Sequence, residues 1–502
     1  MATGIDLEIS RRRFAAIMGG MAAGAGALAG AEGDWVNLFD GRSLKGWRDS
    51  ENKGSWKVAE GCLIADGPRS HLFYAGPVMS ANFRNFELEA EVMSQPLANS
   101  GIYFHTAYQE KGWPDKGFEV QVNNTAKGEG SYSENKKTGS LYGVRNLYKA
   151  MVKDGEWFKL HIAVRQKNIQ VRLNGSLVVD YTEPTPAPAY PEGRGRSLGT
   201  GTFALQCHDP GSKARYRNIR VRPLPNDVAQ PATPAASTDA IAMQILDLGA
   251  RNFPMVDYHV HLKGDLTLES ALAMSRQTGI FYGIAVNCGK GFPVENETGA
   301  RAFLKSLGGA PVFAAMQAEG REWVDMFDRR TAGLFDYVFT DSMTWTDNRG
   351  RRMRTWIPAE VGTIADPQEF METLVSRAVG ILEREPIDIY VNPTFIPGVI
   401  AKDYDKLWTD ERIMKVVKAA KTGGVAIEIN NRYKLPGLRF LQAAKAEGLK
   451  FSFGTNNTDA NLGRCEYGLE AVKQCNLKWT DFFVPAPVGE RGIDRKGSIL
   501  KS

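Results

Sequence analysis

A change in composition near the middle of the chain constrains its fold most. Residues 223–240, PLPNDVAQPATPAASTDA, are rich in Pro, Ala, Ser and Thr and carry no apolar periodicity, which is typical of an interdomain linker. The chain has 502 residues, more than one hydrophobic core usually organises. We therefore predict a first domain at 34–224, a linker at 225–240, a second domain at 241–490 and a tail at 491–502.

Before the linker, apolar and polar residues alternate in many short runs. An Asn174-Gly175 pair separates two of them and is typical of a tight hairpin turn. Period-two alternation buries one face of each strand, so this half is predicted to be an antiparallel β-sandwich. The apolar positions are Phe86, Leu88, Ala90 and Val92; Phe118, Val120 and Val122; Leu160, Ile162 and Val164; and Ile169, Val171 and Leu173.

After the linker the pattern becomes strand, helix, strand. Residues 367–385 and 410–424 carry apolar side chains at helical spacing and lie between apolar runs that resemble buried strands. Repeated units of this kind predict a parallel α/β barrel. The candidate strands are Met255–Val260, Tyr282–Asn287, Val312–Met316, Tyr337–Thr340, Ile387–Asn392, Val425–Ile429 and Phe451–Gly454.

Alternation also sorts the polar side chains of the sandwich onto one face. Amides and carboxylates there can bind vicinal hydroxyls, and aromatic rings can stack on sugars, so a saccharide-binding surface is one interpretation. The other is an outer face that only contacts water. Three runs contribute, with Glu119, Gln121 and Asn123; Tyr103 and His105; and Gln206 and His208.

Seven motifs of the first half, taken in order, resemble the 3-keto-disaccharide hydrolase domain family, which implies a concanavalin-like jelly roll. Two positions depart from the family pattern: His105, where Arg is more common, and Asn123, where Asp is common. The motifs are NLFDGRSLKGW (37–47), NSGIYFH (99–105), GFEVQVNN (117–124), TGSLYGV (138–144), GEWFKLHIAV (155–164), VRLNGSLVVDY (171–181) and LQCHDPGSKARYRNIRVRPL (205–224).

The resemblance implies a particular chemistry. A ketone at C3 of a sugar acidifies the C2 proton, so a base can remove it and expel the glycosidic oxygen from C1, after which water adds. We expect Glu119 and His208 to transfer protons, whereas His71 and His161 are interpreted as structural or surface residues. The residues expected to bind and orient substrate are Tyr103, His105, Gln121, Asn123, Tyr142 and Gln206.

The second half resembles the polymerase-and-histidinol-phosphatase (PHP) family, a (β/α)7 metal-dependent barrel. Its His-x-His motif matches His259 and His261 at the end of the first barrel strand. Where the family usually has further ligands, this chain has Met343, Asn392, Asn456 and Thr458, so a full three-metal site is not expected. The resemblance instead implies one divalent ion, zinc, manganese or iron, with candidate ligands His259, His261, Glu319, Asp341, Asn392 and Asp459 and with Glu428 nearby. The alternative is a barrel that has lost its metal.

The N-terminal residues predict export. Ser10, Arg11, Arg12 and Phe14 fit a twin-arginine signal, and an uncharged run to Ala31 follows, so residues 1–31 are interpreted as a cleaved signal peptide. A membrane anchor is the alternative, but the run is short of the roughly 20 residues that a span requires. A periplasmic or secreted protein without a stable membrane anchor is expected.

Charge and cysteine content limit other functions. The formal net charge of +5 is small and falls partly in the N-terminal segment, so no nucleic-acid partner is expected. The five cysteines show no CxxC pairing and give neither a zinc signature nor a disulfide framework. The sequence leaves the oligomeric state open.

Three hypotheses follow. The first is an exported bacterial carbohydrate enzyme that cleaves 3-keto-glycosides in the sandwich. In the second, the sandwich only binds sugar and the barrel is a metal-dependent hydrolase. The third is a saccharide-binding protein without catalysis.

Overall fold

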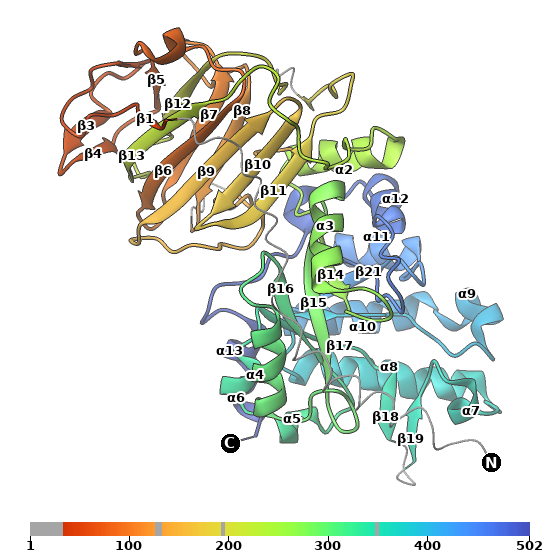
Figure 1. The fold of residues 1–502 in the computed structure, drawn as a ribbon. Coiled ribbons are helices and arrows are strands. Elements are labelled where there is room, and N and C mark those ends of the chain that lie inside the picture. Colours follow the sequence, from red (N-terminus) through yellow and green to blue (C-terminus); the bar gives the residue numbers. More distant parts are fainter. Residues whose placement is uncertain (1–33, 126–132, 192–195, 347–350, 502) are drawn as a thin grey trace. The chain divides into compact units, whose positions relative to one another are not determined.

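The computed structural model describes residues 34–125, 133–191, 196–346 and 351–501 (Figure 1). The predicted signal peptide, residues 1–31, lies outside the described residues. Val36–Ser502 form one compact unit, which holds all the elements below. In the described part of the chain, no helix combines the length and the apolar character needed to cross a membrane.

Two antiparallel sheets form the first half of this unit, as the alternation predicts. The larger has the order β11-β10-β9-β6-β13-β4-β3 with β1 added to β13, and the smaller has the order β2-β5-β12-β7-β8. The larger contains β1 (Val36–Asn37), β3 (Trp56–Ala59), β4 (Cys62–Ala65), β6 (Phe86–Ser94), β9 (Phe158–Arg165), β10 (Asn168–Leu173), β11 (Ser176–Thr182) and β13 (Ala214–Pro223). The smaller contains β2 (Trp47–Asp49), β5 (Ser70–Tyr74), β7 (Asn99–Thr106), β8 (Phe118–Asn123) and β12 (Thr202–Cys207).

Strand β8 of the smaller sheet is buried on its polar face as well as on its apolar one. Every residue of β8 is buried, the polar Glu119, Gln121 and Asn123 included. A loop segment, Gly139–Tyr142, pairs with this strand, since Gln121 N donates to Ser140 O and Tyr142 N donates to Glu119 O, each at 2.9 Å. A solvated outer face, one of the two interpretations of the alternation, is therefore wrong for these residues.

Seven parallel strands close into a barrel in the second half, in the order β14-β15-β16-β17-β20-β21-β22. Each overlaps one of the seven candidate strands, so the (β/α)7 barrel is confirmed, whereas kinship with the PHP family stays a prediction. The strands are β14 (Val256–Val260), β15 (Phe281–Cys288), β16 (Phe313–Ala318), β17 (Tyr337–Thr340), β20 (Ile389–Tyr390), β21 (Ala426–Asn430) and β22 (Phe451–Gly454). A hairpin that the sequence did not reveal, β18 (Thr344–Thr346) and β19 (Arg352–Arg354), follows β17.

Helices connect the barrel strands and carry the apolar stripes expected of them. In α8 the buried side chains include Met371, Val375, Ala378 and Leu382, three to four residues apart, which is the spacing of one helix face. The helices of eight or more residues are α2 (Ala240–Ala250), α3 (Leu268–Thr278), α4 (Glu297–Ser306), α8 (Pro367–Arg384), α10 (Asp410–Gly423), α11 (Leu438–Ala446) and α12 (Glu466–Gln474). The shorter ones are α5 (Trp323–Met326), α6 (Arg329–Ala332), α7 (Pro358–Val361), α9 (Tyr404–Leu407) and α13 (Gly492–Lys496).

The predicted linker runs along the edge of the larger sheet. Thr182, the last residue of β11, donates from its hydroxyl to Thr233 O and accepts from Ala236 N, both at 2.9 Å. Asp239 then caps α2 by accepting from the amides of Ile241 and Ala242. The segment between the two halves is thus held by hydrogen bonds.

Candidate functional site

A pocket of about 170 Å³ opens on the polar face of the smaller sheet. Strands β7, β8 and β12 form its floor, and loops supply the remaining walls. The lining residues are Asn99, Tyr103, Trp113, Glu119, Gln121, Glu134, Tyr142, Gln206 and His208.

Glu119 is a buried carboxylate beside one cation and one amide. Gln206 Nε2 donates to its Oε1 at 3.0 Å and is 3.1 Å from the Tyr103 hydroxyl, and Arg196 Nη2 lies 3.7 Å from its Oε2. Burial raises the pKa of Glu119, and the charge of Arg196 opposes that shift. Glu119 is therefore a weakly solvated base that faces a pocket.

Gly101 makes room for this carboxylate. It lies on β7, and a Cβ built on it would overlap Oε1 of Glu119. Its backbone is not left-handed, so the glycine is needed for space. The glycine of the motif NSGIYFH thus has a structural reason.

His208 and Trp113 stand at the mouth of the pocket. Their ring centroids are 4.8 Å apart at an interplanar angle of 38°. His208 Nδ1 lies 2.7 Å from the Asp209 carboxylate, and about a third of its side chain is exposed. The carboxylate fixes the ring so that Nε2 is available for proton transfer.

His71 lies behind the aromatic wall. Its ring centroid is 5.4 Å from that of Tyr103 and 5.6 Å from that of Trp113, both edge to face. Burial lowers its pKa to about 3, so it is neutral. Neither ring nitrogen has a hydrogen-bond partner in the described structure.

The structure brings six of the eight predicted sandwich residues together: Tyr103, Glu119, Gln121, Tyr142, Gln206 and His208. The other two do not line this pocket. Asn123 Nδ2 donates to the carbonyls of Glu134 and Lys136 and so supports a pocket wall. His105 forms two hydrogen bonds with the backbone: Nε2 lies 2.8 Å from Arg84 O, and Nδ1 accepts from Gly199 N at 3.2 Å.

A break in strand pairing explains His105. Strand β12 pairs Thr202 with Thr106 but Ala204 with Tyr103, so β7 holds one extra residue there. His105 takes a φ of 54° in this bulge and packs its ring against Phe86 and Phe104. Strict alternation, which put His105 on the face of Tyr103, fails at that point.

Four residues of the site were missed by the sequence reasoning. Asn99 stands within a motif quoted for the family resemblance, and its position on β7 could have been read from alternation. Trp113, Glu134 and Arg196 lie outside the strands, where no periodicity marks which way a side chain points.

His259 and His261 lie at the end of β14, as predicted, and both are buried. His259 Nδ1 is 2.6 Å from Glu428 Oε1, and His261 Nδ1 is 3.1 Å from Ala285 O. Each ring therefore uses Nδ1 as a donor, and each Nε2 is left without a partner in the described structure. An imidazole oriented in this way is suited to bind a metal through Nε2.

The predicted acidic ligands are buried too, but they have other partners. Glu319 accepts from Asn287 Nδ2 at 2.7 Å and from the Thr344 hydroxyl at 3.0 Å. Asp341 accepts from Met343 N and from Asn392 Nδ2. Burial, then the charge of Asp341, raises the pKa of Glu319 to about 8, and burial raises that of Asp341.

This donor set fits a metal ion in part. The two unpaired Nε2 atoms are suitable ligands, but the described residues contain no group of three His, Cys, Asp or Glu arranged to hold an ion. Asn392 Oδ1 accepts from Asn430 and Asn456 instead. Asp459 is exposed, unlike the buried histidines, and its carboxylate accepts from Asn461 N.

Comparisons with known proteins bear on the sandwich. Residues 34–222 match the family model of the 3-keto-alpha-glucoside-1,2-lyase-like domain, which confirms the resemblance for this segment. A 3-keto-disaccharide hydrolase of Bacteroides thetaiotaomicron is 24% identical over 229 residues, which cover 38% of this chain and 78% of that protein.

Two solved structures also match part of this chain. A "putative glycosyl hydrolase" from Parabacteroides distasonis is 23% identical, with a TM-score of 0.33, over 39% of this chain and 95% of the other. The carbohydrate-binding module CBM66 from Bacillus subtilis is 14% identical, with a TM-score of 0.24, over 35% of this chain and 95% of the other.

Proposed function

We propose that the sandwich pocket cleaves 3-keto-glycosides by β-elimination followed by hydration. The observation that carries the proposal is Glu119: a buried carboxylate that faces a pocket lined by amides and aromatic rings. The family match of residues 34–222 and the name of the Bacteroides relative support this substrate class.

In the proposed reaction, Glu119 takes the C2 proton of the sugar. The electron pair of that C–H bond moves toward the C3 ketone, whose oxygen gains negative charge. Arg196, beside Glu119, supplies a positive charge for this oxyanion, and the Tyr103 hydroxyl can donate to it.

The enolate then re-forms the ketone, and a C1=C2 double bond forms as the C1–O bond breaks. The glycosidic oxygen leaves with the electron pair of that bond. The leaving oxygen takes a proton, which His208, oriented by Asp209, can deliver from the mouth of the pocket. Addition of water across C1=C2 completes a net hydrolysis, and the Trp113 side chain lines the pocket in which the sugar would lie.

Substrate selectivity tests this proposal. The full-length protein should turn over 3-keto-trehalose or 3-keto-lactose, whereas trehalose and lactose should remain intact because their C2 protons are not acidic. Equal cleavage of the unoxidised sugars would refute the elimination. Binding of the keto sugars without turnover would favour a saccharide-binding protein.

A second candidate function rests on the two unpaired imidazole nitrogens of the barrel. His259 and His261 would hold one divalent ion, such as zinc, manganese or iron, and Glu319 and Asp341 are the further ligands that the family resemblance implies. Such an ion would supply Lewis-acid chemistry, and the barrel would then be the hydrolase and the sandwich its sugar-binding module.

Metal content tests the second candidate. Full-length protein dialysed against zinc, manganese or iron should retain about one ion per chain, and the double variant His259→Ala, His261→Ala should retain none. A wild-type protein without metal after this treatment would leave catalysis to the sandwich.

We further propose periplasmic or secreted localisation from residues 10–31.

A further inference from the structure

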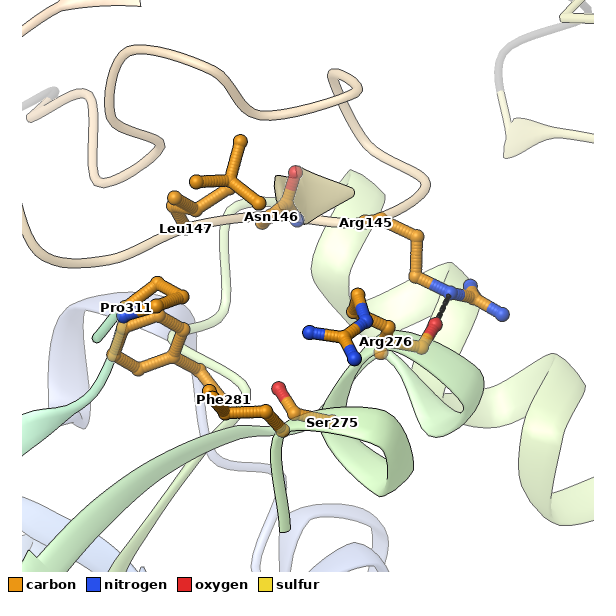
Figure 2. A pocket seen from close by; sticks show the side chains of 10 residues that line it. Arg145, Asn146, Leu147, Ser275, Arg276, Phe281 and Pro311 are labelled. Atoms are coloured by element: carbon orange, nitrogen blue, oxygen red, sulfur yellow. Dashed lines mark hydrogen bonds between the residues drawn. The ribbon is translucent and has the colours of Figure 1, made fainter. Parts of the chain in front are cut away.

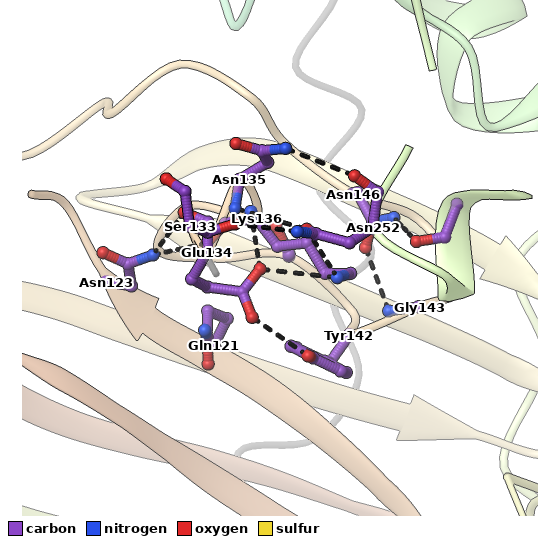
Figure 3. Close-up of polar contacts among 12 residues, drawn as sticks. Gln121, Asn123, Ser133, Glu134, Asn135, Lys136, Tyr142, Gly143, Asn146 and Asn252 are labelled. Carbon is purple, nitrogen blue, oxygen red and sulfur yellow. Dashed lines mark hydrogen bonds and ion pairs between the residues drawn. The ribbon is translucent and has the colours of Figure 1, made fainter. Parts of the chain in front are cut away.

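The pocket wall that carries Glu134 is fastened to the start of the barrel half. Asn252, between α2 and β14, donates from Nδ2 to Ser133 O at 2.7 Å (Figure 3). Asn135 Nδ2 in turn donates to Asn252 O at 3.2 Å. Asn252 holds a left-handed backbone with a φ of 69°, which asparagine tolerates better than most residues.

At the centre of this contact lies a buried ion pair. Lys136 Nζ is 3.4 Å from Glu134 Oε1 and 3.2 Å from Asn252 Oδ1, and it stands 4.5 Å from the ring centroid of Tyr142. Glu134 Oε2 accepts from the Tyr142 hydroxyl at 3.0 Å. Glu134 and Tyr142 both line the pocket.

A buried ammonium group requires acceptors, because burial removes the water that would otherwise solvate it. The Lys136 and Glu134 side chains are only 1% and 2% exposed. Asn252 Oδ1 is thus an acceptor for Lys136 that comes from outside the sandwich, and Lys136 in turn orients Glu134.

Other contacts hold the same two regions together. Asn146 Nδ2 donates to Gly249 O, and the Tyr148 hydroxyl donates to Phe253 O. Arg145 donates to Arg276 O near the end of α3 (Figure 2). It also donates to Gln277 O. These contacts fix the neighbours of Asn252 relative to residues 145–148 of the sandwich.

We propose that Asn252 is a positioning residue for the sandwich pocket: through Lys136 it fixes Glu134 and Tyr142 in the pocket wall, so the barrel half completes the sugar site. This inference rests on the proposed function. It implies that the sandwich site depends on residues beyond 34–224.

The electrostatics of Glu119 give the inference a specific signature. Burial is the largest cause of the raised pKa of Glu119, and Arg196, Tyr103, His208 and Glu134 are among the groups that modify that pKa; the negative charge of Glu134 favours the protonated form of Glu119. Lys136 offsets this charge as long as Asn252 holds it. Loosening Lys136 should therefore move the acid limb of the kcat/KM profile to higher pH.

The test uses the full chain with 3-keto-trehalose as the probe. Asn252→Gly deletes the amide but tolerates the left-handed backbone, so it should lower kcat/KM about tenfold, the order expected for losing a hydrogen bond to a buried charge. Amide hydrogen exchange of residues 133–136 should quicken as well. Asn135→Ala loosens the same contact but keeps Glu134 Oε1 and Asn252 Oδ1 in place for Lys136, so its kcat/KM should stay within about twofold of the wild type.

Asn476→Gly serves as the matched control. Asn476 is an exposed barrel residue with a φ of 50°. A kcat/KM of Asn252→Gly within twofold of that control, or an equal loss in Asn135→Ala, would overturn the inference. Should the wild type fail to turn over the probe, only the proposed function falls, and unchanged exchange at 133–136 would still overturn the role of Asn252.

Discussion

Glu119 in the sandwich and Glu428 in the barrel have similar surroundings, although the two halves of the molecule have different folds. Each is a buried strand residue, and each lies against a glycine of the neighbouring strand, Gly101 or Gly454, whose Cβ would overlap the carboxylate. Each also has an amide or imidazole donor on Oε1. The same packing device therefore serves both halves of the molecule.

The difference lies in what else surrounds each carboxylate. Glu428 Oε2 accepts from Asn392 N and Asn430 Nδ2, while Oε1 pairs with His259, so its oxygens serve to orient neighbours. Glu119 faces a pocket of about 170 Å³ beside one guanidinium. Both carboxylates are buried, so burial does not distinguish them; the pocket beside Glu119 does.

The largest expected effect separates these two carboxylates directly. Glu119→Gln retains the shape of the side chain but removes the base, so turnover of 3-keto-trehalose should fall on the order of a hundredfold or more. Glu428→Gln should leave that turnover within about twofold of the wild type. The reverse result, a large loss in Glu428→Gln and none in Glu119→Gln, would place catalysis in the barrel.

The glycines provide a smaller and sharper test. Gly101→Ala should push the Glu119 carboxylate out of position and lower kcat on the order of tenfold. Gly454→Ala should leave kcat unchanged and lower Tm, because it disturbs Glu428 and its partners. Equal kcat in Gly101→Ala and the wild type would show that the position of Glu119 is not critical.

The smallest effect concerns pH. Because burial raises the pKa of Glu119 and the base must be ionised, kcat/KM should rise with pH through a value above the usual pKa of about 4.3 for Glu. Arg196→Gln removes a charge that favours the carboxylate, so the same limb should move to higher pH. An acid limb at or below the ordinary value would argue against Glu119 as the base.

Alternation predicted most strand residues of the sandwich pocket and little else. It placed Glu119, Gln121 and Gln206 on one face because regular strands point alternate side chains the same way. It failed at His105, where a bulge adds one residue, and it could not reach Trp113 or Arg196, whose positions depend on loop conformation.

In the barrel, the position of His259 and His261 at a strand end was predictable from the motif and the strand pattern. The hydrogen bonds of Glu319 and Asp341 were not, because Asn287, Thr344 and Asn392 come from other strands or from the segments that follow them. A sequence shows which groups can bind a metal, but not which of them are already engaged with one another.

The loop segment Gly139–Tyr142 also has a consequence for solubility. Strand β8 ends the smaller sheet, and an open edge of that kind can pair with a strand of another molecule and start aggregation. The loop occupies this edge through the amides of Gln121 and Tyr142. The backbone that brings Tyr142 to the pocket thereby also shields the sheet from self-association, so changes made there to alter substrate preference carry a risk of precipitation.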